Sequence, residues 1–382
     1  MPDLVTWTGD STGHTIFGNP FVTTEGSKFV TKSLKKTFAD SVMFAIHGNH
    51  EFAPFNIQDM SQNFDEVIEI IAEDWKSWMT EEVYEEYTDK TYFSYDAKTH
   101  PHATEEFKKK LDRTRIISLN TQNCYNFNFA LMSEENDPGQ EFEWLENLLR
   151  QMEKDGEVGI LIGHIPLGNL DCIHEVSVRM KALQDRFQHI LRLNLFGHTH
   201  YEEFEVHRSI EDNKPIGTSH VTPSVTTHMY QNPSLRVITL DEETKLPIEV
   251  KTYTFHIDKA NQKDKYAKFV LDHEISEHYG VEDLSPSSML EISEKIIDDE
   301  EMGIKYNINR RAGSPLAHED VKDGCNRDCR WIIHCNTAYN DYHDKLHCMR
   351  FHNMGVLDWL SHVFDFFHGG WVEKLHPEDS DK

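Results

Sequence analysis

The chain has 382 residues, enough to bury a large core and to form two or three domains, or one α/β unit with an appendage. Its 66 acidic residues outnumber its 38 basic ones, and the net charge of -28 disfavours a nucleic-acid partner and attraction to an anionic membrane. Protonation of the 24 histidines would cancel most of that charge, so the composition is compatible with an acidic compartment and with a site that binds cations.

Targeting signals and cysteine spacing bear on the compartment. The sequence contains no apolar run of about 18 residues that could span a bilayer, and residues 1–15 do not have the pattern of a signal peptide. The six cysteines are an even set, and four of them fall in the segment GCNRDCRWIIHC and at Cys348. This spacing favours a disulfide-tied module over a zinc ribbon, with reduced cytosolic thiols as the alternative.

Four apolar, β-rich segments each end in a polar loop that contains glycine. The segments are LVTW, SVMFAI, VGILI and LRLNLF, at residues 4–7, 41–46, 158–162 and 191–196. Helical periodicity over 64–79 and 140–154 lies between them, and Gly156 is a stop signal for the second helix. This alternation predicts an α/β fold whose loops meet beyond the carboxyl ends of the strands.

The second half of the chain has a different pattern. The stretches 202–209, 214–228, 235–241 and 248–257 resemble strands that complete the β core, and from about Asp258 the chain becomes helical and acidic. We therefore expect a catalytic domain over 1–257 and a small helical, cysteine-containing domain over 258–382. The apolar tail at 354–372 could lie on a lipid surface, but its acidic residues favour packing against the core.

Five side chains in the four loops have the chemistry of metal ligands. Oxygen and nitrogen donors that suit zinc, manganese or iron come from Asp10, Asn49, His164, His198 and His200. Taken singly, each has a structural explanation, since Asp10 and Asn49 can cap turns and His164 can be a buried imidazole with satisfied hydrogen bonds. Because all of them follow apolar strands, we predict that they converge on one metal site.

The loop motifs GD, GNHE, GH and GHTH, in this order, resemble those of the calcineurin-like metallophosphoesterases. The longer stretches WTGDSTGH, HGNHE, GHIPLG, GHTHYEEFEV and PSVTTHMYQNPSLRV resemble the acid sphingomyelinase family in particular. The C-terminal cysteine pattern extends this resemblance over nearly the whole chain. The resemblance implies a four-layer α/β/β/α metallophosphoesterase sandwich with a small disulfide-tied helical C-terminal domain.

The resemblance also implies a role for each loop residue. One of two zinc ions would be held by Asn49, His164 and His198, while His200 would bind the other and Asp10 would bridge both. Two further histidines, His50 and His14, would contact the phosphate and serve the leaving oxygen. The implied disulfides are Cys124–Cys172, Cys325–Cys329 and Cys335–Cys348.

The implied reaction is phosphodiester hydrolysis. Attack by a metal-bound hydroxide would cleave sphingomyelin to ceramide and phosphocholine, while a protonated histidine donates to the departing alkoxide. Sphingomyelin or another phosphodiester is thus the expected partner, and a lipid surface could be a second one. The family resemblance favours a secreted or lysosomal protein.

One motif of the family is missing from the sequence. The family's first motif, Asp-x-His, does not occur before Asp10, so one metal would keep only Asp10 and His200 among its protein ligands. A secretory signal and the lipid-presenting domain of the sphingomyelinases are also missing. We therefore expect that an N-terminal part has been lost from this sequence.

Two alternatives to sphingomyelin hydrolysis stay open. The first is a secreted hydrolase of nucleotides or other small phosphodiesters, since Phe127 stands where the sphingomyelinase pattern has Glu, and His228 where it has Tyr. Against this, Glu51 in GNHE and the stretches GHIPLG and EEFEV resemble the sphingomyelinases more closely. The second alternative is a catalytically impaired binding protein, because of the missing metal motif.

Overall fold

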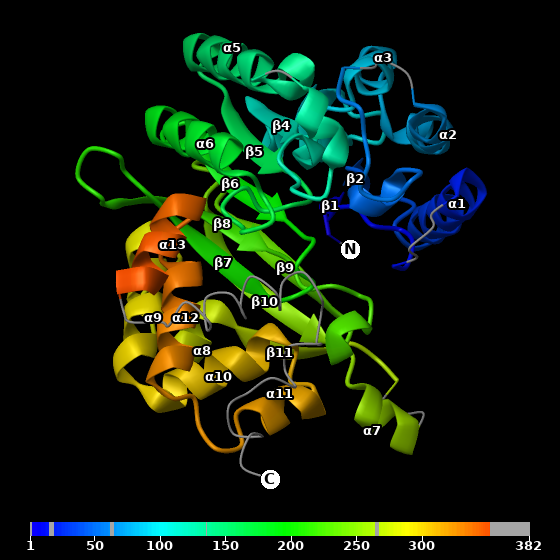
Figure 1. The fold of residues 1–382 in the computed structure, drawn as a ribbon. Coiled ribbons are helices and arrows are strands. Elements are labelled where there is room, and N and C mark those ends of the chain that lie inside the picture. The colour runs from blue at the N-terminus through cyan, green and yellow to red at the C-terminus, as the bar shows by residue number, and fades with distance from the viewer. Residues whose placement is uncertain (1, 15–18, 62–64, 135, 264–266, 352–382) are drawn as a thin grey trace. The chain divides into compact units, whose positions relative to one another are not determined.

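The computed structural model describes residues 2–14, 19–61, 65–134, 136–263 and 267–351 (Figure 1). The chain forms two compact units. The first comprises Met1–Leu167, Ala182–His198 and Leu240–Pro247, and the second Gly168–Lys181, Thr199–Thr239 and Ile248–Lys382. The domain boundary expected after residue 257 stays a prediction, and the tail at 354–372 lies outside the described residues.

The first unit is built on two groups of strands. Its strands are β1 (Leu4–Trp7), β2 (Val42–Ala45), β3 (Phe93–Asp96), β4 (Thr114–Ser118), β5 (Val158–Ile162) and β6 (Leu191–Phe196). β1 pairs in parallel with β2, while β4, β5 and β6 are parallel neighbours and β3 runs antiparallel to β4. The four strands predicted from the sequence are confirmed as β1, β2, β5 and β6, and β3 and β4 extend that set.

Helices flank these strands. They are α1 (Pro20–Thr37), α2 (Glu66–Trp75), α3 (Glu81–Lys90), α4 (Glu105–Lys110) and α5 (Glu141–Asp155), and α6 (His174–Arg186) has residues in both units. α2 and the 3-10 turn Lys76–Trp78 account for most of the helix predicted at 64–79. The helix predicted at 140–154 is confirmed as α5, which ends where Gly156 adopts a φ of 68°. Its buried face packs on β5, since Met152 lies against Gly159.

The second unit contains a β-hairpin and a small sheet. β7 (Glu203–Arg208) pairs antiparallel with β8 (Pro215–Val221), and a three-stranded sheet has the order β11 (Val270–Glu274), β10 (Pro247–Thr254) and β9 (Ser234–Leu240). The strands expected after His200 are thereby confirmed. β11 corrects the expectation that the chain becomes helical from about Asp258: in its sequence VLDHE two apolar residues precede three polar ones, and one position of the strand is buried.

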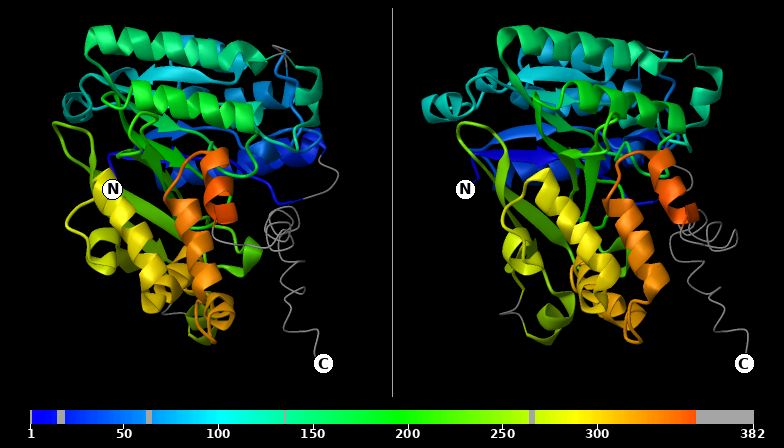
Figure 2. Two further views of the ribbon diagram at one scale, coloured as in Figure 1. Left: turned by 60° about the vertical axis from the view of Figure 1, so that its left-hand side comes forward. Right: turned by 90° about the vertical axis from the view of Figure 1, so that its left-hand side faces the viewer.

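Helices cover the hairpin of the second unit. α9 (Pro286–Asp298) packs on β7 and β8, and α12 (Arg327–Thr337) packs on β7 and α9 (Figure 2). Lys345 of α13 (Tyr342–Phe351) forms a buried ion pair with Glu205 of β7. The remaining helices are α7 (Ile257–Gln262), α8 (Ile275–Tyr279), α10 (Glu300–Arg310) and α11 (Pro315–Asp320).

Disulfides tie the helical part of the second unit. The expected bonds Cys325–Cys329 and Cys335–Cys348 are confirmed. The pairing of Cys124 with Cys172, whose residues belong to different units, stays a prediction. No helix among the described residues is long and apolar enough to cross a bilayer.

A buried network of charges links strands of the second unit. Glu202 lies 2.8 Å from Nε2 of His273 and 3.0 Å from Arg236, and Nδ1 of His273 lies 2.9 Å from Asp272. Because both ring nitrogens of His273 face carboxylates, both carry protons. Burial lowers the pKa of His273, but the two carboxylates outweigh burial and raise this pKa to about 9.

Candidate metal centre

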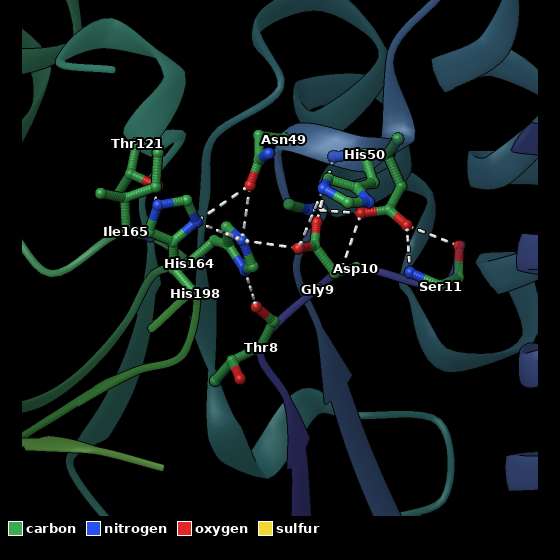
Figure 3. Close-up of polar contacts among 12 residues, drawn as sticks. Thr8, Gly9, Asp10, Ser11, Asn49, His50, Thr121, His164, Ile165 and His198 are labelled. Carbon is green, nitrogen blue, oxygen red and sulfur yellow. Dashed lines mark hydrogen bonds and ion pairs between the residues drawn. The ribbon is translucent and has the colours of Figure 1, made fainter. Parts of the chain in front are cut away.

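Four loops of the first unit bring their side chains together. Asp10 follows β1, Asn49 follows β2, His164 follows β5 and His198 follows β6. β1 and β2 are parallel, as are β5 and β6, so within each pair the two loops leave the same edge. Figure 3 shows the four side chains pointing toward one another. The structure thus brings together four of the five ligands expected from the sequence.

Short distances separate the donor atoms. Nε2 of His164 lies 3.2 Å from Oδ2 of Asp10, 2.9 Å from Oδ1 of Asn49 and 3.2 Å from Nδ1 of His198. Nδ1 of His198 lies 3.0 Å from the same Asn49 oxygen. Among the residues that the structure describes, Asp10, His164 and His198 form the one group of three or more acidic, histidine or cysteine side chains that could hold a metal ion.

Neighbouring groups fix which atoms face the centre. The amide nitrogen of Asn49 donates to Oδ1 of Asn56 at 2.8 Å, so the Asn49 oxygen points at the two histidines. Nδ1 of His164 lies 2.5 Å from the carbonyl oxygen of Thr8, which can only accept, so this nitrogen carries a proton and Nε2 is the ring atom that faces the centre. One carboxylate oxygen, one amide oxygen and one imidazole nitrogen therefore converge.

The electrostatics set the protonation of these groups. Burial lowers the pKa of His164, but Asp10 and the carbonyl oxygen of Thr8 outweigh burial and raise this pKa, so a metal ion would have to displace the Nε2 proton of His164. Burial raises the pKa of Asp10, but His164 and His50 outweigh burial and hold this pKa well below its usual value, so the carboxyl is ionised. Burial lowers the pKa of His198 to about 3, so its ring is neutral and has a lone pair to share. A neutral imidazole and an ionised carboxylate are the forms in which these side chains bind metals.

Glu51 holds the loop that carries Asp10. Its carboxylate accepts hydrogen bonds from the backbone N–H groups of Asp10 at 2.9 Å, Ser11 at 2.6 Å and Gly48 at 2.5 Å, and from the Ser11 hydroxyl at 2.5 Å. Glu51 is fully buried. The motif GNHE does not by itself predict a role for Glu51 in the site, although its position next to His50 is a signal that could have revealed one.

Backbone geometry at the centre leaves little room. Asp10 and His198 adopt left-handed φ values of 59° and 68°, which most residues avoid. A Cβ atom at Gly48 would lie 2.2 Å from Oδ1 of Asp10 and 2.8 Å from Cε1 of His164. Only glycine therefore fits at position 48, where the loop after β2 passes the loop after β1.

The other predicted site residues lie at different places. Nε2 of His50 is 3.9 Å from Oδ2 of Asp10, and its Nδ1 is 2.9 Å from the carbonyl oxygen of Thr12. The ring of His14 packs edge-on against His50, with 4.3 Å between ring centroids. His200 belongs to the second unit, where its ring lies 5.4 Å from that of His228. The role of His200 as a ligand therefore stays a prediction.

A row of aromatic side chains leads away from the centre. The ring of Tyr125 lies 5.3 Å edge-on to His198, Phe127 lies 5.6 Å from Tyr125, and Phe129 lies 6.4 Å from Phe127. Tyr125 is buried, whereas Phe129 is 57% exposed. These residues, Tyr125, Phe127 and Phe129, form the aromatic row, which runs from a candidate ligand to the surface.

The donor set fits a divalent cation. Asp10, Asn49 and His164 point potential ligand atoms at one another at distances near 3 Å, and the neutral ring of His198 adds a fourth donor. A cation among these atoms would take the place of the proton on Nε2 of His164. Two imidazole nitrogens with carboxylate and amide oxygens form a borderline ligand set that suits first-row transition metals.

Comparison with known families agrees with this chemistry. Residues 1–202, more than half of the chain, match the family described as calcineurin-like phosphoesterase. The chain belongs to the calcineurin-like phosphoesterases. Residues 214–355 of this phosphoesterase match a second family, described as the acid sphingomyelin phosphodiesterase C-terminal region. The phosphoesterase has the mixed α/β fold of its family with a disulfide-bonded helical region, and the four-layer stacking stays a prediction.

Individual relatives are phosphodiesterases. The phosphoesterase is 30% identical to sphingomyelin phosphodiesterase B of Dictyostelium discoideum over 90% of its own length and 54% of the relative's. It is 29% identical to sphingomyelin phosphodiesterase 2 of Caenorhabditis elegans, covering 77% of this chain and 48% of that one. It is 25% identical to the cyclic GMP-AMP phosphodiesterase SMPDL3A of Bos taurus, covering 78% of this chain and 67% of that one. The chain thus spans about half the length of the first two relatives.

Proposed function

We propose that this phosphoesterase is a zinc-dependent phosphodiesterase that hydrolyses sphingomyelin to ceramide and phosphocholine. The observation that carries the proposal is the convergence of Asp10, Asn49, His164 and His198 in a chain of this family. The resemblance of residues 214–355 to the C-terminal region of acid sphingomyelin phosphodiesterase supports the choice of substrate.

The four side chains would hold one zinc ion, and His200 would serve a second ion that shares Asp10. A divalent metal bound there supplies a Lewis acid for the phosphoryl oxygens and lowers the pKa of a bound water. The protein's own contribution is to keep Asp10 ionised and His198 neutral, and to fix the donors in place before substrate arrives.

His50 is the proposed proton donor to the leaving alkoxide. The carbonyl oxygen of Thr12 accepts from its Nδ1, which leaves Nε2 directed toward Asp10 and the metal ligands. When Nε2 is protonated it can donate to a departing oxygen, a step typically worth about 10² to 10⁴-fold in rate. The ring of His14 packs against His50 and would help to orient it.

The cellular setting follows the relatives. Acid sphingomyelinase-like proteins are among them, so we propose a secreted or lysosomal location, in which the disulfides Cys325–Cys329 and Cys335–Cys348 persist.

Hydrolysis of a nucleotide phosphodiester is the second candidate function. The aromatic row supports it, because stacked rings next to His198 offer a surface on which a nucleobase can stack. The Bos taurus relative is named for cleavage of a cyclic dinucleotide. Phe127, which stands where the sphingomyelinase pattern has Glu, lies in this row.

The decisive variant is His198→Ala. Loss of one ligand from the centre should reduce hydrolysis of a chromogenic phosphodiester by about 10³-fold or more, since metal and substrate positioning depend on it. His189→Ala is the matched control, because this histidine is half exposed and pairs with Glu153. Retained activity in His198→Ala would contradict the proposal. Kinetics on sphingomyelin micelles and on cyclic GMP-AMP then decide between the two substrates, and a metal-loaded protein inactive on both would favour the binding-protein alternative.

A further inference from the structure

The helix α1 buries polar side chains and exposes three of its apolar ones, while Val30 and Leu34 are partly buried. Its buried residues are Thr23, Thr24, Ser27 and Thr31. By contrast, Phe21 and Phe29 are each 73% exposed, and Val22 is 44% exposed. A helix stabilised only by packing on its own domain shows the opposite pattern, with apolar residues facing the core.

The inward face of α1 is well fitted to the first unit. The hydroxyl of Thr31 accepts a hydrogen bond from the indole N–H of Trp75 in α2 at 3.0 Å, and α1 packs beside α2 (Figure 1). A Cβ at Gly26 would lie 2.2 Å from the side chain of Thr12, so α1 also contacts the loop that carries Asp10. Rotation of the helix to bury its phenylalanines would break both contacts.

The exposed face of α1 also carries positive charge. At 100° per residue, the positions of Phe21, Lys28, Phe29, Lys32 and Lys36 fall on one side of the helix, and all five are exposed. The acidic residue on this side is Glu25, which pairs with Lys28 at 3.3 Å. In a chain with a net charge of -28, this face is locally basic.

We propose that the face formed by Phe21, Val22, Phe29, Lys28, Lys32 and Lys36 docks on an anionic lipid surface. The phenylalanines would insert among the acyl chains while the lysines contact lipid phosphates and carboxylates. The overall negative charge does not prevent this, because at physiological salt charges beyond about 8 Å from the surface are screened. Docking would bring the lipid surface next to the loop of Asp10 and Thr12.

The test is sedimentation with vesicles of phosphatidylcholine that contain about one third phosphatidylserine. We expect the wild-type protein to bind them and the double variant Phe21→Ser/Phe29→Ser to bind about 100-fold more weakly, at about tenfold per phenylalanine. Lys32→Gln/Lys36→Gln should lose about fivefold per lysine and show a smaller salt dependence. Ile248→Ser, which changes a 57% exposed side chain in the second unit, is the matched control and should bind as the wild type does.

Three results would overturn the proposal. These are failure of the wild type to bind the vesicles, equal binding by both double variants and the wild type, or a dimeric wild type that the phenylalanine variant converts to monomers without loss of vesicle binding. Because the lysine variant keeps both phenylalanines, it tests the same face even if the serine variant folds poorly. Vesicle binding is measured without turnover, so its failure and a failure of the proposed phosphodiesterase activity are distinguishable.

Discussion

Replacement of Glu51 by glutamine tests how the centre is held in place. The substitution keeps the size of the side chain but removes its charge and leaves one acceptor oxygen where four hydrogen bonds end. The amide oxygen of the glutamine can still accept the hydrogen bonds from the backbone N–H groups of Asp10 and Gly48. The amide nitrogen then faces the N–H of Ser11, while the Ser11 hydroxyl can reverse and accept.

The size of the effect follows from these bonds. One buried N–H loses its partner, which costs about 1 to 3 kcal/mol, and the two retained bonds lose the contribution of the charge, at about 0.5 to 1 kcal/mol each. We therefore expect Glu51→Gln to lower the free energy of unfolding by about 3 kcal/mol. Because the backbone of Asp10 would be held less firmly after its hydrogen bond to Glu51 weakens, kcat should fall by about 10 to 100-fold.

Urea unfolding and kinetics on a soluble chromogenic phosphodiester measure the two effects. Ser11→Ala is the graded control, because it removes only the hydroxyl bond to Glu51 and should cost about 1 kcal/mol. If Glu51→Gln were as stable as the wild type within about 0.5 kcal/mol and kept full kcat, the positioning role of Glu51 would be refuted.

Three further predictions concern other groups. Gly48→Ala should lose metal binding, because its Cβ would lie 2.2 Å from Oδ1 of Asp10; metal analysis of the purified variant checks this. The pKa of His273 is raised to about 9 in the folded protein, so its stabilisation is fully present below its unfolded pKa near 6.5 and is lost as pH rises through 9. The loss of unfolding free energy caused by His273→Gln should therefore shrink by about 3 kcal/mol between about pH 5.5 and pH 9.5, and a pH-independent loss would contradict this. Lys345→Met leaves Glu205 buried without its cation and should cost about 3 to 5 kcal/mol in a denaturant titration.

Much of the fold near the centre could be predicted from the sequence. Buried parallel strands such as β2 and β5 consist of nearly continuous apolar residues, so their ends and the loops beyond them are visible in the sequence. β3 and β11 are harder to predict because they contain Ser94, Asp96, Asp272 and His273, which interrupt the apolar pattern.

The part of the site that could not be predicted depends on contacts between distant residues. Three of the four hydrogen bonds of Glu51 reach back about 40 positions along the chain to Asp10 and Ser11, and periodicity carries no information about such a contact. The inward polar face of α1 is similar, because no local pattern shows that the indole N–H of Trp75 donates to Thr31. The predicted role of His200 as a metal ligand depends on its position relative to Asp10, and a local sequence pattern gives no such position.

The most direct measurement is a calorimetric titration of Zn²⁺ into metal-free wild-type protein and into His164→Ala. If Asp10, Asn49, His164 and His198 form the metal centre, the wild type should bind the ion with release of heat, and the variant should bind at least about 100-fold more weakly because Nε2 of His164 is the atom that faces the other three donors. Equal affinity in the two proteins, or no binding by the wild type, would contradict the account.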